Sequence, residues 1–451
     1  MSKLERQPLV GKYRNYSTYS NSGVDWIGEM PAVWTLKRVK HMFTIRKRIA
    51  GELGYDILSV TQRGIVVKDI ESGEGQLSMD YSKYQRVKPG DFAMNHMDLL
   101  TGYVDISDYD GVTSPDYRVF TLDNTDYFAK YFLYIFQMGY QLRLFFHMGQ
   151  GASHLGRWRL ATDEFNEMVF PVPSCEEQRT IAAFLDYETA RIDRLITQQQ
   201  WLIELLKEKR QAVISHAVTK GLNPNAPMRD SGIEWLGQVP KHWDVSRLKF
   251  ESDVIDCRNK TPEYFDNGEY FVVRTTNVKN QQLNFNNALY TDKNNFEIWT
   301  QRGVPVAGSI LFTREAPTGE VCIVPENVKL CMGQRMMNFI CSREIYTSYL
   351  FDYLISACLE RYINSVSHGS TVSHLRVEQV ENIPVLVPPE EELVAIHEHI
   401  RILKKQYDIL ETKVLKAIEL MQERRIALIS AAVTGKIDLR GWTPPAEEAA
   451  A

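Results

Sequence analysis

The stretch SGVDWIGEMPAVW, which runs from Ser22 to Trp34, returns as SGIEWLGQVPKHW between Ser231 and Trp243. Six of the thirteen positions are identical, and four more are exchanges between similar residues. A second repeat lies downstream, where LKEKRQAVISHAVT (Leu206–Thr219) matches MQERRIALISAAVT (Met421–Thr434) at eight of fourteen positions. Repetition at this spacing predicts two copies of one structural unit.

Each half therefore has the same order: a Trp-Gly-Pro-Trp entry, a long middle, a Val-Pro exit and a charged helix. The middles, Arg38–Val172 and Arg247–Val387, share little sequence. One exception is SHL, which occurs at Ser153–Leu155 and again at Ser373–Leu375. A repeated frame around different inserts predicts one task that is carried out twice, on two different targets.

Length and composition limit the class of protein. A chain of 451 residues with 44% hydrophobic content predicts two or three globular domains. No run of eighteen apolar residues occurs, and the start MSKLERQPLV lacks an apolar core, so we expect neither a membrane span nor a secretory signal. The six cysteines form no C-x-x-C pair, which favours a reducing cytoplasm over a zinc site or disulfides. The net charge of −5 does not by itself favour nucleic acid.

The region after each Val-Pro exit has the periodicity of a long helix. Steps of seven residues give two series in each half: Leu185, Ile192, Gln199, Leu206 and Val213 with Ile181, Glu188, Leu195, Leu202 and Lys209, and Ile400, Tyr407, Val414, Met421 and Leu428 with Ile396, Leu403, Leu410, Ala417 and Arg424. This spacing predicts a coiled coil or a long two-helix bundle. Each helix could instead pack only on its own domain. Matched length and register favour an antiparallel pair, which would relate the halves by a pseudo-twofold axis.

The middles combine alternating apolar strands with one helix each. GIVVKDI (Gly64–Ile70), YFVVRTT (Tyr270–Thr276) and VPVAGSILFTRE (Val304–Glu315) predict strands. Residues 126–146 and 347–363 predict one helix in each insert. The predicted fold class is therefore α+β.

Basic segments without acidic residues recur inside both middles. They are Lys37–Arg48, Gln141–Leu160 and Arg361–Arg376. Small polar residues lie between the cations, and this mixture suits contacts to phosphates and to base edges in a DNA groove. Ordinary solvated charge is the alternative. The candidate DNA contacts are Arg46, Lys47, Arg48, Gln62, Arg63, Asn95, His96, Gln150, Ser153, His154, Arg157, Arg258, Lys260, Arg274, Arg314, Gln334, Arg335, His368, Ser370, Thr371 and His374.

Known catalytic motifs are absent from the sequence. It contains neither G-x-x-x-x-G-K-[ST] nor G-x-G-x-x-G. Pro115-Asp116 is better explained as a turn than as part of a nuclease site, because no Glu-x-Lys follows closely. His154 and His374 lack a second metal ligand at a suitable spacing. We therefore expect no catalytic residues and no metal.

The repeated frame, the Val-Pro exits and the helices ending in AVIS-AVT together resemble the specificity subunit of type I restriction-modification enzymes over roughly residues 20 to 440. The resemblance implies two target-recognition domains, each of which reads one half of an asymmetric bipartite site in double-stranded DNA. It also implies that the antiparallel coiled coil spaces the domains and docks two methyltransferase subunits, which carry S-adenosylmethionine. Restriction subunits can join such a complex, and no membrane is involved.

The corresponding domains are residues 1–173 (first recognition domain), 174–225 (central helix and linker), 226–388 (second recognition domain), 389–441 (C-terminal helix) and 442–451 (flexible tail). Within this scheme, Trp26, Trp34, Trp235 and Trp243 are expected to pack the entry segment against a core rather than to bind DNA. One competing class is a non-enzymatic coiled-coil adaptor that pairs two modules for ligands other than DNA. Another is a self-contained nuclease or methylase with degenerate motifs.

Overall fold

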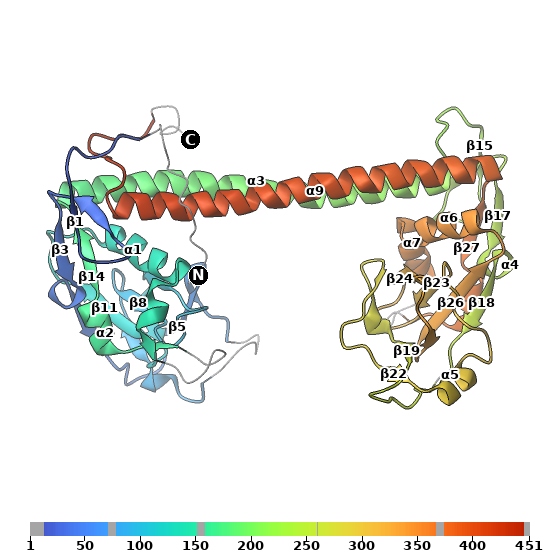
Figure 1. The fold of residues 1–451 in the computed structure, drawn as a ribbon, viewed down its shortest axis with the longest axis horizontal. Helices are drawn as coiled ribbons and strands as arrows, with labels where there is room; N and C mark the ends of the chain where they lie inside the picture. Colours follow the sequence, from blue (N-terminus) through green and yellow to red (C-terminus); the bar gives the residue numbers. More distant parts are fainter. Residues whose placement is uncertain (1–12, 71–77, 151–157, 259, 367–373, 446–451) are drawn as a thin grey trace. The chain divides into compact units, whose positions relative to one another are not determined.

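The computed structural model describes residues 13–70, 78–150, 158–258, 260–366 and 374–445 (Figure 1). The chain divides into two compact units. Unit 1 comprises Met1–Gln198 and Lys416–Ala451, and unit 2 comprises Gln199–Leu415. This division cuts both long helices, so each unit holds one half of each helix. The predicted domain boundaries, which keep each helix whole, stay a prediction.

Unit 1 begins with a hairpin. Two four-stranded sheets follow, and in the sequence their strands lie between the two strands of a framing pair. The hairpin is β1 (Tyr19–Asn21) with β2 (Glu29–Pro31), and the framing pair is β3 (Thr35–Arg38) with β14 (Val169–Val172). The sheets have the orders β4-β11-β8-β9 and β6-β5-β10-β7. Their strands are β4 (Phe43–Arg46), β5 (Asp56–Thr61), β6 (Gly64–Val67), β7 (Gln85–Val87), β8 (Phe92–Met94), β9 (Val104–Ile106), β10 (Gly111–Thr113) and β11 (Arg118–Leu122). The remaining elements are α1 (Ala129–Gln141), α2 (Thr162–Glu167), the 3-10 helices η1 (Val39–His41), η2 (Tyr81–Lys83) and η3 (Leu144–Met148), and the pair β12 (Gly149–Gln150) with β13 (Arg159–Leu160).

Unit 2 repeats this plan. Its hairpin is β15 (Met228–Asp230) with β16 (Gln238–Pro240), and its framing pair is β17 (Asp244–Arg247) with β27 (Pro384–Val387). The sheets have the orders β18-β26-β23-β24 and β22-β19-β25, beside a small pair of β20 and β21. Their strands are β18 (Ser252–Asp256), β19 (Tyr270–Val273), β20 (Val278–Lys279), β21 (Gln282–Leu283), β22 (Tyr290–Thr291), β23 (Ile310–Thr313), β24 (Val321–Ile323), β25 (Leu330–Met332) and β26 (Met336–Cys341). The helices are α4 (Leu248–Glu251), α5 (Lys293–Trp299), α6 (Glu344–Leu354), α7 (Ala357–Val366), α8 (Val377–Glu381) and the 3-10 helix η4 (Thr275–Asn277).

The two inserts share topology although they share little sequence. The order β18-β26-β23-β24 matches β4-β11-β8-β9, and the parallel pair β19–β25 matches β5–β10. The registers also agree, because Phe120 lies opposite Phe92, and Phe339 lies opposite Ile310. The α+β fold class with two equivalent domains is therefore confirmed, as are the strands predicted near Gly64, Tyr270 and Ile310.

The SHL match between the inserts is out of register. The Leu160 amide donates to the carbonyl of His96 at 2.9 Å, and the Leu375 amide donates to the carbonyl of Arg314 at 3.2 Å. Leu375 thus corresponds to Leu160, at the same offset that aligns Val172 with Val387. The earlier copy of SHL lies five residues upstream of this position, so its likeness to the later copy does not mark equivalent places.

The helix predicted at 347–363 is two helices. α6 ends at Leu354 and α7 begins at Ala357, because Ser356 interrupts the backbone ladder. The Ser356 hydroxyl donates to the carbonyl of Tyr353 at 2.6 Å and accepts from the amide of Cys358 at 3.2 Å. A serine in this position caps the helix that follows it. The equivalent prediction at 126–146 also ends early, since α1 gives way to η3.

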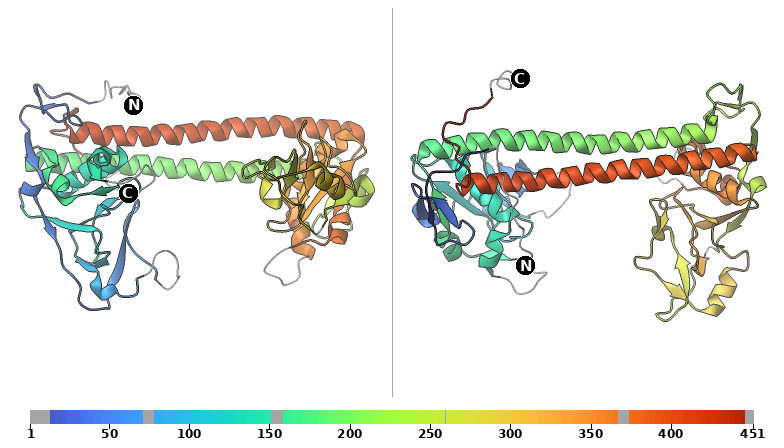
Figure 2. Two further views of the ribbon diagram at one scale, coloured as in Figure 1. Left: turned by 60° about the horizontal axis from the view of Figure 1, so that its bottom comes forward. Right: turned by 45° about the horizontal axis from the view of Figure 1, so that its top comes forward.

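The long helices are α3 (Cys175–Lys220) and α9 (Glu390–Val433), each continuous. In unit 1 the first half of α3 lies beside the second half of α9, where Arg425 Nε is 3.0 Å from Asp193 Oδ1 (Figure 2). In unit 2 the second half of α3 lies beside the first half of α9, where Arg210 Nη1 is 2.8 Å from Asp408 Oδ1. The predicted antiparallel pairing is therefore confirmed.

One of the two predicted seam series is correct. The series through Leu185 and through Ile400 is buried or half-buried at every position in both helices. The companion series fails after Glu188: Leu195 and Leu202 are 40% and 38% exposed, whereas Ile203 is 8% exposed. Leu410 and Arg424 fail in the same way. A helix with 3.6 residues per turn drifts by about 20° per heptad, so the inward position moves on by one residue after a few heptads.

The repeated tryptophans pack as predicted. Trp34 is 4% exposed and Trp243 is fully buried, while Trp26 and Trp235 are partly buried against the same two cores. The indole nitrogen of Trp243 donates to Glu392 Oε2 at 3.0 Å, in the first turn of α9. Trp34 instead meets the ring of Tyr16, with 5.8 Å between the ring centres.

Each tryptophan also packs against the end of the long helix that belongs to the other repeat. Gly221 follows α3 at φ +74°, and a Cβ there would lie 3.1 Å from Trp243 Cζ2. Gly435 follows α9 at φ +70°, and a Cβ there would lie 2.2 Å from Pro31 Cδ and 3.1 Å from Trp34. Glycine is required at both places for its conformation and its small size.

Tyrosines on α1 and α6 hold the same helix ends. The Tyr131 hydroxyl donates to the carbonyl of Val433 at 3.2 Å, and the Tyr349 hydroxyl donates to the carbonyl of Val218 at 2.7 Å. These carbonyls lie in the last turns of α9 and α3, where no intrahelical donor remains. Across the described residues, no helix is long and apolar enough to cross a lipid bilayer.

Candidate nucleic-acid interface

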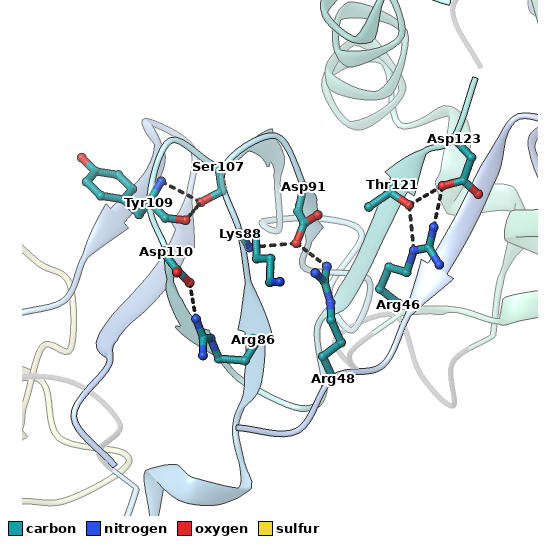
Figure 3. A network of polar contacts seen from close by, with 10 residues as sticks. All are labelled: Arg46, Arg48, Arg86, Lys88, Asp91, Ser107, Tyr109, Asp110, Thr121 and Asp123. Carbon is teal, nitrogen blue, oxygen red and sulfur yellow. Dashed lines mark hydrogen bonds and ion pairs between the residues drawn. The ribbon is translucent and has the colours of Figure 1, made fainter. Parts of the chain in front are cut away.

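The basic segment of β4 lies beside acidic residues from distant parts of unit 1 (Figure 3). Arg46 Nη2 is 2.7 Å from Asp123 Oδ1, and Arg46 Nε donates to Thr121 Oγ1 at 2.9 Å. Arg48 forms an ion pair with Asp91. Lys47, between them, is exposed. The segment carries less free positive charge than its sequence indicates, because the two acids come from distant parts of the chain, just after β11 and just before β8.

Arg86 belongs to the same network. Its guanidinium pairs with Asp110 at 2.5 Å and lies 3.7 Å from the centre of the Tyr55 ring. The hydrogen bond from Arg86 to Asp110 raises the pKa of the guanidinium. Ion pairs of this kind hold cationic side chains in fixed orientations at the end of a sheet, where a phosphate could compete for them.

Gln62 and Arg63 form the tip of the hairpin between β5 and β6. Thr61 lies opposite Gly64, so Gln62 and Arg63 alone make the turn. Gly64 has φ +104°, which the turn requires. Both side chains at the tip are exposed. A narrow polar tip of this shape suits entry into a groove.

His96 lies at the end of β8 and is only 6% exposed. Burial, followed by the nearby charges of Arg118 and Arg159, lowers its pKa from 6.5 to about 3. The ring is therefore neutral at physiological pH and has little surface with which to meet a base. This placement indicates a structural role for His96, in contrast to the prediction of DNA contact. Asn95, its neighbour, is half-buried.

Sequence reasoning missed Arg118, the first residue of β11. It is 4% exposed, its Nη2 donates to the carbonyl of Leu160 at 3.1 Å, and its guanidinium lies 4.5 Å from the Phe165 ring centre. Burial lowers its pKa to about 10. The only sequence signal was one arginine at the start of an apolar strand, which also fits an exposed strand end.

In unit 2, three separate stretches of sequence meet at one end of the large sheet. Gln334 and Arg335 form the exposed turn between β25 and β26, where Arg335 has φ +67°. The Arg335 carbonyl accepts from the amide of Arg314 at 2.9 Å, and the Arg314 carbonyl accepts from the amide of Leu375. His374, next to Leu375, is exposed. The structure thus brings together four of the predicted contacts.

The two arginines at this end differ in exposure. Arg314 is 8% exposed, with its Nε 3.8 Å from Asp256 Oδ1, and Arg302 contacts the same carboxylate at 3.3 Å. Arg335 is exposed and its Nε lies 3.0 Å from Glu315 Oε2. Arg335 is therefore the better placed of the two to meet a DNA base or phosphate.

A second group in unit 2 surrounds Trp299, which the sequence reasoning did not select. Arg258 lies 5.7 Å from the Trp299 ring centre and donates to Gln301 at 3.2 Å. The indole nitrogen of Trp299 donates to the carbonyl of Lys260 at 3.2 Å. Arg274 is not part of the group around Trp299; its guanidinium donates to the carbonyl of Asn287 at 2.9 Å.

Several predicted contacts lie outside the described residues. They are Ser153, His154, Arg157, His368, Ser370, Thr371 and the side chain of Gln150. Within the described ranges, no group of three or more His, Cys, Asp or Glu side chains is arranged to hold a metal ion.

Residues 69–205 and 240–420 match the family described as the type I restriction modification DNA specificity domain. The chain is 24% identical over 291 residues to the type I restriction enzyme MjaVIII specificity subunit of Methanocaldococcus jannaschii, which covers 61% of this chain and 64% of that relative. It thus spans less than two thirds of that relative's length. The MjaIX specificity subunit of the same organism is 23% identical over 433 residues, with 91% and 95% of the two chains covered.

The fold also matches a solved structure. A chain from a study of complex assembly and conformational transition of the type I R-M system superposes with a TM-score of 0.64 at 13% identity. The match covers 90% of this chain and 98% of that chain. At this level of identity, the likeness supports the fold alone.

Proposed function

The chain belongs to the family of type I restriction-modification DNA specificity domains, and we propose that it is the subunit that recognises DNA for a methyltransferase complex. Unit 1 recognises one half of a bipartite site and unit 2 recognises the other half. Neither half carries out chemistry. The activity, the DNA substrate and the partners are all part of this proposal.

The observation that carries the proposal is one scaffold with two different sets of exposed polar residues. Unit 1 offers Gln62 and Arg63 at a hairpin tip, with Lys47 on the basic segment. Unit 2 offers Gln334 and Arg335 at a turn, with His374 nearby. Amide, guanidinium and imidazole groups are the ones that distinguish bases in the major groove. The Gln-Arg pair stands on different turns of the two scaffolds, after β5 in unit 1 and after β25 in unit 2, and this difference in placement implies different half-sites.

The long helices supply the surface for partner subunits. In unit 2, Trp201 is 66% exposed and Ile409 is 46% exposed, on α3 and α9 respectively. Other apolar side chains of these helix halves are also exposed, including Leu202, Leu205 and Ile402. Apolar side chains that point away from a helix pair are typical of a protein interface. We propose that two methyltransferase subunits dock here and carry S-adenosylmethionine, with or without restriction subunits.

Methylome sequencing tests the bipartite site directly. The chain is expressed with its methyltransferase subunit, and the methylated motif is determined. Replacing residues 38–172 with the insert of another family member should change one half-site and leave the other intact, since both junctions lie in the β3–β14 pair. A single contiguous palindrome as the methylated motif would contradict the proposal. So would methyl transfer by the purified chain alone.

The continuous helices imply that helix length fixes the gap between half-sites. At 1.5 Å per residue, four residues inserted after Leu206 lengthen α3 by about 6 Å, or one or two base pairs. We expect a longer preferred spacer, unchanged half-sites and weaker binding, because α9 is not lengthened. Selection from random-spacer DNA measures the change. An unchanged spacer at full affinity would show that the helices do not set the gap.

A further inference from the structure

Unit 2 has a groove on its framing strands, and none of the residues that line it is a candidate DNA contact. β17, α4 and β27 lie close to one another in unit 2 (Figure 1). The groove has a volume of about 480 Å³, and its apolar lining comes from Ile233, Val245, Phe250 and Pro384. Ile233 belongs to the repeated entry segment, whereas Val245 and Pro384 lie on the framing strands β17 and β27.

Phe250 is the most unusual residue of the groove. Its side chain is 69% exposed, although phenylalanine is ordinarily among the most buried residue types. Lys249 Nζ lies 5.3 Å from the centre of its ring. An exposed aromatic ring beside a cation presents an apolar surface and a positive charge at the same place.

The equivalent place in unit 1 carries its own counter-charge. Arg38 Nε lies 3.1 Å from Glu167 Oε2, and Lys40 also pairs with Glu167. The strand registers identify the counterparts, because Arg38 lies opposite Val169 and Arg247 lies opposite Pro384. In unit 1, one carboxylate therefore pairs with two cations.

Unit 2 has no carboxylate at the position equivalent to Glu167. Asn382 stands where unit 1 has Glu167, and Phe250 stands where unit 1 has His41. Arg247 Nη1 is 3.0 Å from Asn382 Oδ1, so its partner is neutral. The nearby carboxylate of Glu251 accepts a hydrogen bond from the Ser246 hydroxyl at 2.6 Å.

We propose that this groove binds an acidic peptide segment of a partner protein, with one bulky apolar side chain. The apolar side chain covers Phe250 and Val245. A carboxylate takes the place of the missing glutamate beside Arg247 and Lys249. Because unit 1 fills its equivalent position with Glu167, each chain binds one such segment. This site is separate from the proposed DNA-recognition surface and does not depend on it.

The charge arrangement favours a peptide carboxylate over other occupants. A guanidinium held only by a neutral amide gains a charge-assisted hydrogen bond when a carboxylate arrives, and that bond is stronger than the one it replaces. The apolar walls exclude a purely polar ligand, since Ile233, Val245, Phe250 and Pro384 would stay uncovered.

A fluorescein-labelled peptide with the sequence Asp-Glu-Phe-Asp-Glu tests the proposal by fluorescence anisotropy with the full chain. We expect saturable binding that weakens at high salt. Asn382→Glu and Phe250→His, which copy the residues of unit 1 and so preserve the local fold, should each weaken binding by about tenfold. Peptides with lysine for the acids, or alanine for phenylalanine, should not bind.

The reciprocal variant is the sharpest control. In a chain that carries Phe250→His and Asn382→Glu, the changes Glu167→Asn and His41→Phe should create a site in unit 1 and restore binding. Equal binding to the wild type and Asn382→Glu would overturn the proposal, as would no saturable binding. Loss of the peptide on addition of duplex DNA would also overturn it, because the peptide would then be occupying the DNA surface.

Discussion

The large sheets of the two units have the same strand order and different cores. In unit 1, Phe43 lies at the centre of an aromatic cluster, with its ring 5.4 Å from Phe92 and 5.5 Å from Phe120. In unit 2, Ser252 and Ile310 occupy the positions of Phe43 and Phe92 in the strand register. The same topology therefore accepts two different core compositions.

The units also differ in how they treat charge at the end of these sheets. Unit 1 buries Arg118 and neutral His96, whereas unit 2 buries Arg314 beside Asp256. The contacts that both units keep are those of the frame, from the tryptophans and tyrosines to the helix ends. The comparison teaches that the frame determines the topology, which leaves the cores and the sheet ends free to differ.

Removing a frame tryptophan should have the largest effect. Trp243→Ala and Trp34→Ala should each lower the free energy of unfolding by about 3–5 kcal/mol, because both indoles are buried. Trp243→Phe should cost more than Trp34→Phe, since the Trp243 indole donates a hydrogen bond to Glu392, whereas the buried indole nitrogen of Trp34 has no hydrogen-bond partner among the described residues. Urea unfolding measures both. Equal losses for the two phenylalanine variants would mean that the frames are energetically equivalent.

Changes in the exposed turns should affect one half-site only. Under the proposed function, Gln334→Ala should weaken discrimination at one position of the half-site assigned to unit 2 by about 1–3 kcal/mol, because the amide proposed to pair with a base edge is lost. Gln62→Ala should do the same for the other half-site. Binding to a panel of single-base variants measures the effect. Loss at both half-sites from either change would show that the units do not recognise DNA separately.

Acid should destabilise unit 1 through His96. Its pKa in the folded state, about 3, lies below the unfolded value of 6.5, so its contribution to stability is complete above pH 6.5 and is lost as the pH falls toward 3. Between pH 7.5 and 5.5 the loss is about 1 kcal/mol.

Urea unfolding of the wild type and His96→Gln at the two pH values tests this expectation. The variant should lose about 1 kcal/mol less than the wild type over the same interval, since glutamine has no proton to gain. An identical pH dependence in the two proteins would show that His96 has the same pKa in the folded and unfolded states, and hence that it is not buried in solution.

The smallest effect concerns the basic segment. Lys47→Ala should reduce the slope of the logarithm of DNA affinity against the logarithm of salt concentration by about one, the value for one phosphate contact. The reduction should be equal for cognate and scrambled duplexes. Arg48→Ala should lower it by less, because Asp91 already balances that charge. Salt titrations on both duplexes separate the two variants. A larger effect from Arg48 would mean that DNA displaces Asp91.

The frame could be predicted from the sequence because its contacts repeat. Trp34 and Trp243 recur with their glycines and prolines, and the periodicity near Leu185 and Ile400 predicted the two long helices. The prediction of buried positions in the companion series fails from Leu195 onward, because a strict seven-residue step ignores that an α-helix has 3.6 residues per turn. The break at Ser356 was missed because a serine also occurs inside helices.

The candidate interface was less predictable because its charges are balanced across the fold. The sequence around Arg46 and Arg48 contains no acid, yet Asp123, just after β11, and Asp91, just before β8, contact these side chains. Arg118 gave no signal because one arginine beside an apolar strand fits an exposed end as well. Gln334, Arg335 and His374 were selected separately, and only the strand pairing brings them to one place.

The packing of Trp34 against the end of α9 has a consequence for synthesis on the ribosome. The core of unit 1 includes Leu428, Ile429 and Val433, which are translated after the whole of unit 2, whereas unit 2 is one uninterrupted segment. Domains usually complete their folding in the order in which they are translated. Here the order is reversed: the domain that emerges first must wait for the final turns of α9. Its unfinished apolar surface is thus exposed for most of translation, and this makes unit 1 the part of the nascent chain that most needs a chaperone.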